Sequence, residues 1–312
     1  MEDAWPPLAF ESWRDTAMTL QLWTQVVGKI RLASTPWVNH SWQVPLYVTA
    51  RGLATSPMPN GKEAVELEFD FIAHRLVGRS SNGALAELAL QPMTVADFYH
   101  SALSLTQELG MNAQIHPIPA ELPGAIAFPD DRLHHSYDAE AVHRFWRALL
   151  QADRLFKLFR TAFLGKASPV HFFWGSFDLA VTRFSGRQAP LHPGGVPGLA
   201  DSVTQEAYSH EVSSAGFWPG SESFPRAVFY SYAYPQPEGF AQAKMPAGAV
   251  YETTLGEFIL PYDTVRASSD PDALVMDFLQ ASYAAAASLG RWDRAALECE
   301  LGELDRPRRL AR

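Results

Sequence analysis

Chargeable side chains interrupt an otherwise apolar and aromatic stretch, SPVHFFWGSFDLAVTRFSGR, at residues 168–187. A charge buried without a partner costs several kcal/mol, so these groups either pair inside the core or line a pocket. In a pocket, His171 and Asp178 are candidates for acid–base catalysis. Arg183 and Arg187 are candidate ligand-binding residues, because the planar guanidinium suits carboxylate or phosphate. In the alternative, one arginine pairs with Asp178 or Glu211 and the other is solvated.

The period of a strand predicts how these residues are distributed. Asp178 and Arg183 fall on opposite faces of a regular strand. Gly175 is expected to form a bulge or a hairpin turn, because glycine weakens a strand interior without such a role. We therefore expect a pocket floor where the strands of the second half meet, with Trp174 among its ligand-binding side chains.

A second polar segment is SHEVSSAGFWPG, residues 209–220. His210 and Glu211 are further catalytic candidates, although adjacent residues point to opposite faces of a strand. One of them with His171 and Asp178 would give two histidines and one carboxylate, a ligand set used for iron or zinc. The sequence has no tight H-x-H or H-E-x-x-H spacing, so a transition metal is only one alternative and the metal stays unknown. The other alternative is a buried histidine that holds two strands in register.

Aromatic side chains supply the remaining candidate ligand contacts. Trp218, Tyr230 and Tyr232 could wall a pocket with an apolar body and a polar tip. The same tyrosines could equally be an ordinary cross-strand ladder. His40 lies at a helix-to-strand junction, in the segment NHSWQVP, where ligand contacts are common.

Hydrophobic periodicity predicts an α+β fold, with mostly antiparallel sheets flanked by helices. Apolar residues recur at helical spacing in four segments, near 12–34, 94–110, 138–164 and 270–290. Alternation predicts strands between 42 and 90 and again at 169–184, about 207–217, 226–234 and about 256–260, and a short strand in NAQIHPI. Both halves thus run helix, strands, helix, and they could be two similar halves packed as one unit.

The predicted organisation is a single unit over residues 1–312. A possible subdivision has an N-terminal half at 1–118, a C-terminal half at 132–300 and a flexible tail at 301–312. The proline-rich stretch 117–131 is the expected hinge. The segment QAPLHPGGVPGLADS is expected to form a mobile loop or lid.

Composition narrows the function. With 25 basic and 34 acidic residues the net charge is -9, which disfavours nucleic acid and anionic membranes as partners. A single cysteine excludes an intramolecular disulfide, and the sequence has neither a signal-like start nor an apolar run of about 20 residues. We expect a cytoplasmic protein whose partner is a small polar or anionic molecule; the oligomeric state is not predicted. Glycine-rich nucleotide motifs are absent from the sequence, so no nucleotide cofactor is expected.

Five sequence blocks carry a family resemblance. They are LWTQVVGKIRLASTPWVNHSWQVPLYVTARGLATSP, SPVHFFWGSFDLAVTRFSGR, AYSHEVSSAGFWPG, FYSYAYPQPEGF and GEFILPYDTVR. From Trp5 to about Glu298 the chain resembles an uncharacterised bacterial family, the domain-of-unknown-function family 5996. The resemblance implies that the whole length is one family domain, and it implies no particular activity.

Three functional hypotheses follow. The favoured one is an enzyme that acts on a small polar or anionic molecule by histidine and carboxylate acid–base chemistry, with or without a metal. The first alternative is a non-catalytic binding protein with an aromatic-lined pocket. The second alternative is a structural or interaction protein.

Overall fold

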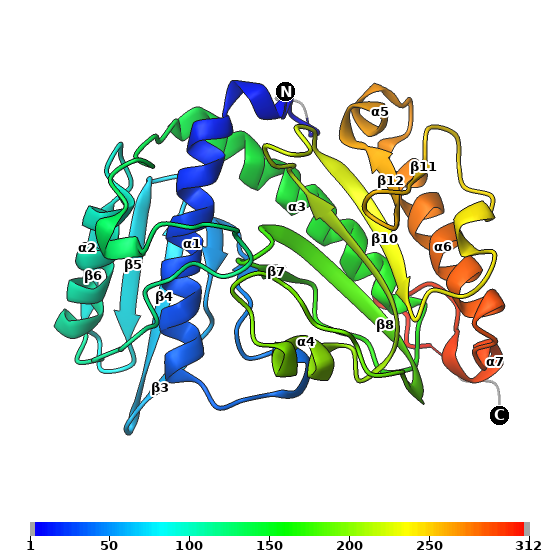
Figure 1. The fold of residues 1–312 in the computed structure, drawn as a ribbon, viewed down its shortest axis with the longest axis horizontal. Coiled ribbons are helices and arrows are strands. Elements are labelled where there is room, and N and C mark those ends of the chain that lie inside the picture. Colours follow the sequence, from blue (N-terminus) through cyan, green and yellow to red (C-terminus); the bar gives the residue numbers. More distant parts are fainter. Residues whose placement is uncertain (1–3, 309–312) are drawn as a thin grey trace.

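The computed structural model describes residues 4–308, and within them it has two antiparallel sheets of six strands each together with seven α-helices. The predicted α+β class is confirmed. In Figure 1 the N-terminal sheet is drawn in cyan and blue on the left and the C-terminal sheet in green to orange on the right. In both halves a long helix precedes the strands and another follows them.

The strands are as follows. The N-terminal sheet contains β1 (Tyr47–Val48), β2 (Gly52–Ala54), β3 (Met58–Asn60), β4 (Glu63–Asp70), β5 (Arg75–Ser80) and β6 (Leu85–Ala89), in the order β1-β2-β4-β5-β6 with β3 paired to β4. The C-terminal sheet contains β7 (His171–Phe173), β8 (Asp178–Gln188), β9 (His210–Trp218), β10 (Val228–Tyr234), β11 (Val250–Glu252) and β12 (Glu257–Pro261), in the order β11-β12-β10-β9-β8-β7.

The helices are α1 (Arg14–Ser34), α2 (Val95–Glu108), α3 (Ala139–Thr161), α4 (Asp201–Ala207), α5 (Tyr262–Ala267), α6 (Pro271–Leu289) and α7 (Arg294–Leu297). The long ones match the predicted segments. Thr94 and Asp138 cap α2 and α3 by accepting backbone N–H bonds, as such side chains do at helix starts. Ser12 does not cap α1: its hydroxyl donates to the Ala9 carbonyl, and Trp13 occupies the N-cap position.

The C-terminal sheet has one face against helices and one face that carries the polar residues. Helix α3 packs on β8, and α6 packs on β9 and β10 (Figure 1). Arg183 points to this helical face, where it donates to the Phe159 carbonyl. Asp178, at the start of the same strand, points the other way, as the strand period predicts. We call this second surface the site face.

Within residues 4–308, one pair of residues links the backbones of the two sheets. Leu46, next to β1, and Phe172, in β7, exchange two backbone hydrogen bonds of 2.9 and 2.7 Å. Buried apolar side chains from both halves, Trp5 through Trp292, form one continuous cluster across this junction. The halves therefore share a core.

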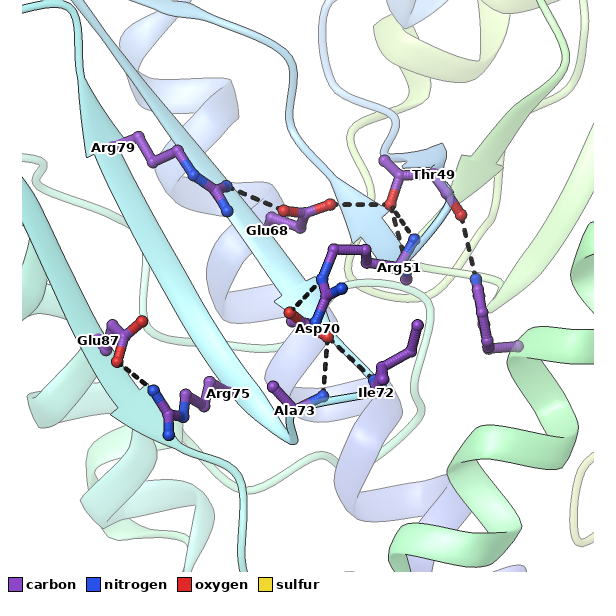
Figure 2. Close-up of polar contacts among 11 residues, drawn as sticks. Thr49, Arg51, Glu68, Asp70, Ile72, Ala73, Arg75, Arg79 and Glu87 are labelled. Carbon is purple, nitrogen blue, oxygen red and sulfur yellow. Dashed lines mark hydrogen bonds and ion pairs between the residues drawn. The ribbon is translucent and has the colours of Figure 1, made fainter.

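Two acidic residues of β4 and one of β6 form ion pairs with arginines. Figure 2 shows Arg79 bonded to Glu68, Arg51 to Asp70 and Arg75 to Glu87, at 2.9, 2.6 and 2.6 Å. Glu68 and Asp70 are buried, and their arginine partners compensate for the loss of water around the two carboxylates. Burial raises the pKa of Asp70, but the bonds from Arg51 and from the Ala73 and Ile72 amides outweigh it and hold that pKa below its ordinary value.

The expected hinge and the start of the expected tail both make hydrogen bonds to helices. The proline-rich stretch 117–131 is anchored to α1, where Gln25 exchanges two hydrogen bonds with Ala120, at 2.9 and 2.7 Å. Of the predicted tail 301–312, residues 309–312 lie outside the described residues. Gly302 and Arg308 both bond to Thr161, at 2.8 and 2.5 Å.

The N-terminal segment docks against the C-terminal half. Tyr262 Oη donates to the Pro6 carbonyl and Arg266 Nε donates to the Trp5 carbonyl, both at 2.9 Å. In Figure 1 the blue start of the chain accordingly lies beside the orange α5.

Two local predictions are wrong. The segment NAQIHPI forms no strand, and α4 occupies residues expected to be loop and strand. Both segments are short, and their final conformations depend on what they pack against.

Candidate functional site

Three carboxylates and three tyrosines lie together on the site face, and we call this group the carboxylate–tyrosine site. Its members are Glu121, Asp178, Glu257, Tyr208, Tyr230 and Tyr232. Asp178 begins β8, the two later tyrosines lie on β10, and Glu257 begins β12 beside Tyr232 in the sheet register. Residues from separate strands therefore meet because the sheet order places β8, β9, β10 and β12 side by side.

Asp178 is the buried centre of the hydrogen-bond network. Tyr230 Oη donates to one carboxylate oxygen and Ser176 Oγ donates to the other. The Tyr230 ring reaches Asp178 by crossing β9 at Gly216, where a Cβ atom would lie 2.3 Å from the tyrosine oxygen. Glycine at this position is required by the tyrosine, which explains a glycine inside a central strand.

Glu121 enters the site from the proline-rich loop. Its carboxylate lies against Gly175, where a Cβ atom would be 2.0 Å from Oε1. Gly175 belongs to the turn between β7 and β8, and Gln21 of α1 donates to its carbonyl at 2.7 Å. The prediction of a turn at Gly175 is confirmed, and the turn makes room for a carboxylate from another segment.

A loop covers the tyrosines. Tyr208, at the end of α4, bonds to Tyr232 through their hydroxyls at 2.8 Å, and His192 stacks on the Tyr208 ring with centroids 4.8 Å apart. Tyr234 Oη donates to the Pro190 carbonyl at 3.1 Å, and the Glu121 amide donates to the Pro197 carbonyl at 2.8 Å. The segment expected to be a lid thus lies over the site in contact with it.

The electrostatics of the site favour protonated groups near neutral pH. Burial, with a smaller contribution from the Asp178 carboxylate, raises the pKa values of Glu121 and Glu257 to about 7. Burial also raises the pKa of Asp178, although bonds from Ser176 and Tyr230 oppose it. The pKa of Tyr208 rises to about 12, through burial and then the charges of all three carboxylates.

These values define what the site can do. Its tyrosines are hydrogen-bond donors at neutral pH, and its two glutamates are poised to exchange a proton. No described residue makes a hydrogen bond or an ion pair with the carboxylate of Glu121 or Glu257. Both are half-buried, so a ligand's hydroxyl or amine could reach them.

The residues predicted from the sequence do not form one constellation. His171 and His210 lie opposite Ala180 and Gln188 of β8, so eight residues separate them along the strand, roughly 26 Å. The predicted set of two histidines and one carboxylate is therefore wrong. Among residues 4–308 no group of three or more His, Cys, Asp or Glu side chains could hold a metal ion.

Both arginines already have partners within the chain. Arg183 is fully buried, with its guanidinium carbon 3.4 Å from the Phe159 ring centroid and 4.3 Å from that of Tyr283. Arg187 bonds to Glu211 at 2.7 Å, the pairing weighed as the alternative from the sequence. The Arg183 environment is an aromatic box on the helical face, away from Asp178.

The other candidates lie in separate places. His40 is buried and bonds to Lys166 Nζ at 2.6 Å, with its ring centroid 6.1 Å from that of His210. Trp174 donates to the Val44 carbonyl at 2.9 Å and packs on α1 at Gly28. Trp218 lies on the site face, stacked on Phe224. Only Asp178, Tyr230 and Tyr232 of the predicted residues belong to the carboxylate–tyrosine site.

Sequence reasoning missed Glu121, Glu257, Tyr208 and Ser176. Glu121 comes from a loop and Glu257 from the first residue of a short strand, and neither position has a periodic pattern. One usable signal was present, since Gly216 interrupts an aromatic strand and a glycine there indicates a close approach.

Comparison with known families gives one match. The sequence profile of the family of unknown function DUF5996 matches residues 5–299 of the chain. The chain belongs to this family. Comparisons with curated proteins and with solved structures found no match. The DUF5996 match includes every member of the carboxylate–tyrosine site.

Proposed function

We propose that the protein is an enzyme that acts on a small polar molecule by acid–base chemistry at the carboxylate–tyrosine site. The proposal rests on one observation: Glu121 and Glu257 are half-buried, lack partners among the described residues and have pKa values of about 7 beside Asp178. An acid or base is most effective when its pKa is near the working pH. Either glutamate could therefore give or take a proton.

The charge of the site indicates the kind of substrate. A carboxylate at this site repels an anionic group at close range, and in either protonation state the carboxyl oxygens accept from hydroxyl or amine donors. We therefore propose that the group bound at this site is neutral or cationic, such as a hydroxyl or an amine. Tyr230 already donates to Asp178, and Tyr208 and Tyr232 share one hydrogen bond, so one hydroxyl of the latter pair keeps a proton that would be donated to an oxygen atom of the same molecule.

A second candidate function is binding without catalysis. Trp218, Phe224 and Tyr232 pack against the buried cluster of Val228, Tyr230 and Ile259, separate from the main core. Such an aromatic surface beside polar groups suits ligand binding. In this case the carboxylates would orient the ligand and no bond would change.

Untargeted mass spectrometry of a small-molecule cell extract distinguishes the two functions. Wild type should deplete at least one compound and generate a product, while Glu257→Gln and Glu121→Gln should not. The matched control, Glu238→Gln, changes an exposed glutamate outside the site and should behave as wild type. Retention of a compound without conversion would support the binding function. If no compound is depleted and none is retained, both functions are contradicted.

Two further expectations concern the cellular location of the protein and its domain organisation. No helix within residues 4–308 is long and apolar enough to cross a membrane. We propose a cytoplasmic location, which the single cysteine and the absence of disulfide potential support. We also propose that the chain acts as one unit, supported by the core shared between its halves.

A further inference from the structure

A lysine, a histidine and two aromatic rings meet where the loop after α1 contacts α4. Lys166 Nζ lies 2.6 Å from His40 Nε2. The same nitrogen lies 5.2 Å from the Trp42 ring centroid and 4.8 Å from that of Phe184. The Phe184 amide donates to the Lys166 carbonyl at 3.0 Å, which fixes the lysine backbone beside β8. In Figure 1 the blue loop after α1 passes beside α4.

The backbone fixes the orientation of the imidazole. His40 Nδ1 lies 2.9 Å from the Ala207 carbonyl oxygen, and a carbonyl can only accept a hydrogen bond, so Nδ1 carries the proton. Nε2 of the neutral ring therefore holds the lone pair and accepts from Lys166 Nζ. His40 and Ser41 have positive φ angles of 60° and 56°, which are uncommon for residues other than glycine and recur at functional sites.

The surroundings of His40 keep its ring neutral. Burial lowers the pKa of His40, and the bond to the Ala207 carbonyl opposes this shift. The positive charges of Lys166 and His210 lower the pKa of His40 further, while the Glu206 carboxylate raises it. The net shift is downward, so the imidazole is free to accept a proton at Nε2 and holds it only weakly.

The amine of Lys166 has no counter-ion. Within residues 4–308 it forms no ion pair with a carboxylate, whereas Lys157 is paired with Asp153 at 2.6 Å. Burial lowers the pKa of Lys166. The faces of Trp42 and Phe184 attract a cation only weakly at an exposed position. Lys166 therefore lacks the carboxylate that would hold its proton, and a desolvated lysine is more nucleophilic than a solvated one.

We propose that Lys166 is a nucleophilic amine that binds the carbonyl group of an aldehyde or ketone covalently, with His40 as its base. An activated nucleophile needs a base within hydrogen-bond distance and a third group that orients the base. The Ala207 carbonyl is that third group. Lys166 is exposed, so a carbonyl compound in solution can reach it, and the half-buried Trp42 offers an apolar surface to the rest of the compound. This site shares no residue with the carboxylate–tyrosine site.

The proposed reaction is a condensation that needs no further reactant. The nitrogen of the neutral Lys166 amine forms a bond to the carbonyl carbon, and His40 passes a proton from that nitrogen to the carbonyl oxygen. The bond between carbon and oxygen then breaks, and a second proton leaves the nitrogen. Both protons depart with the oxygen as water, which gives an imine between Lys166 and the compound without oxidation or reduction.

Reductive labelling of the full chain tests the site. The probe is benzaldehyde with sodium cyanoborohydride, which converts each imine into a stable secondary amine. The sequence has few lysines, so peptide mass spectrometry can follow them separately. At pH 7 and low conversion, Lys166 should be labelled about tenfold faster, or more, than the exposed Lys62 and Lys244. This comparison is made within the wild-type protein and needs no variant.

Two histidine variants separate the base from its neighbour. Asparagine tolerates a positive φ but takes up no proton, so His40→Asn should slow the labelling of Lys166 about tenfold or more. The matched control is His210→Asn, at a ring 6.1 Å from that of His40, and it should be labelled as wild type is. The exposed Lys62 gives the reference rate in each digest, and circular dichroism checks that both variants fold.

The possible results are distinct. Fast labelling of Lys166 that depends on His40 supports the site. The proposal is overturned if Lys166 is labelled no faster than Lys62 and Lys244, or if the folded His40→Asn and His210→Asn variants are labelled equally fast. Glu257→Gln should leave the labelling of Lys166 unchanged, which separates this proposal from acid–base catalysis at the carboxylate–tyrosine site.

Discussion

Replacing Glu257 by glutamine should make the protein more stable at alkaline pH and leave it nearly unchanged in acid. Burial and the Asp178 carboxylate raise the pKa of Glu257 from 4.5 to about 7 in the folded state. The folded protein therefore holds this proton more tightly than the unfolded chain. Stability that depends on Glu257 is fully present below about pH 4.5 and is lost as the pH rises through about 7.

The magnitude follows from the same values. One unit of difference between the folded and unfolded pKa corresponds to about 1.4 kcal/mol, so the shift of Glu257 from 4.5 to about 7 corresponds to about 3.5 kcal/mol. Because the carboxyl is only half-buried, solvent screens part of this, and we take the cost of the ionised carboxyl to the folded state as about 2–3 kcal/mol above neutral pH. Glutamine fills a similar volume and never ionises, so the variant avoids this cost. At about pH 8 Glu257→Gln should exceed wild type by about 2–3 kcal/mol, and at about pH 5 the two should agree within about 1 kcal/mol.

Urea unfolding followed by tryptophan fluorescence measures these differences. The quantity to compare is variant minus wild type at each pH, because other groups titrate in both proteins. Glu238→Gln, the exposed control, should show little difference at either pH. If the Glu257→Gln difference is the same at both values of pH, the assignment of Glu257 to a buried acidic site is wrong.

Two further substitutions test the networks on the two sheets. Tyr230→Phe removes a hydrogen bond to the buried Asp178 carboxylate and should lower the free energy of unfolding by about 1–3 kcal/mol in urea at neutral pH; an unchanged midpoint would contradict the described network. Asp70→Asn should cost about 1–2 kcal/mol at pH 7, because the Arg51 and amide bonds favour the charged form, and the deficit should shrink as the pH falls below the ordinary Asp value of 3.8. A deficit that persists in strong acid would show that packing, and not charge, explains the loss.

Local patterns predicted much of the fold. The helix beginning after Thr94 and the alternation in β4 are encoded by neighbouring residues, so period and capping identify them. The conformation of α4 depends on contacts with the loop at 39–41, which no local pattern contains. The start of α1 has no capping side chain, because residues 10–12 form a tight turn that leaves Trp13 at the N-cap position.

The candidate site was only partly predictable, because some of its residues meet only through tertiary packing. Asp178 and Tyr230 stand out because polar groups interrupt apolar strands. Glu121 meets them only through tertiary packing of a loop, and its sequence neighbourhood is unremarkable. His171 and His210 looked like one cluster because both lie in aromatic segments, yet strand register separates them by most of the length of β8.

The docking of Trp5 and Pro6 against Tyr262 and Arg266 constrains the order in which the chain can fold. During synthesis the first residues reach their final neighbours only after more than 250 others have been made. Trp5 packs on Phe229 and Tyr262, so its apolar ring stays exposed until the C-terminal sheet exists. Contacts between residues so distant in sequence slow folding, and a nascent chain of this kind spends longer with unprotected surface available to chaperones.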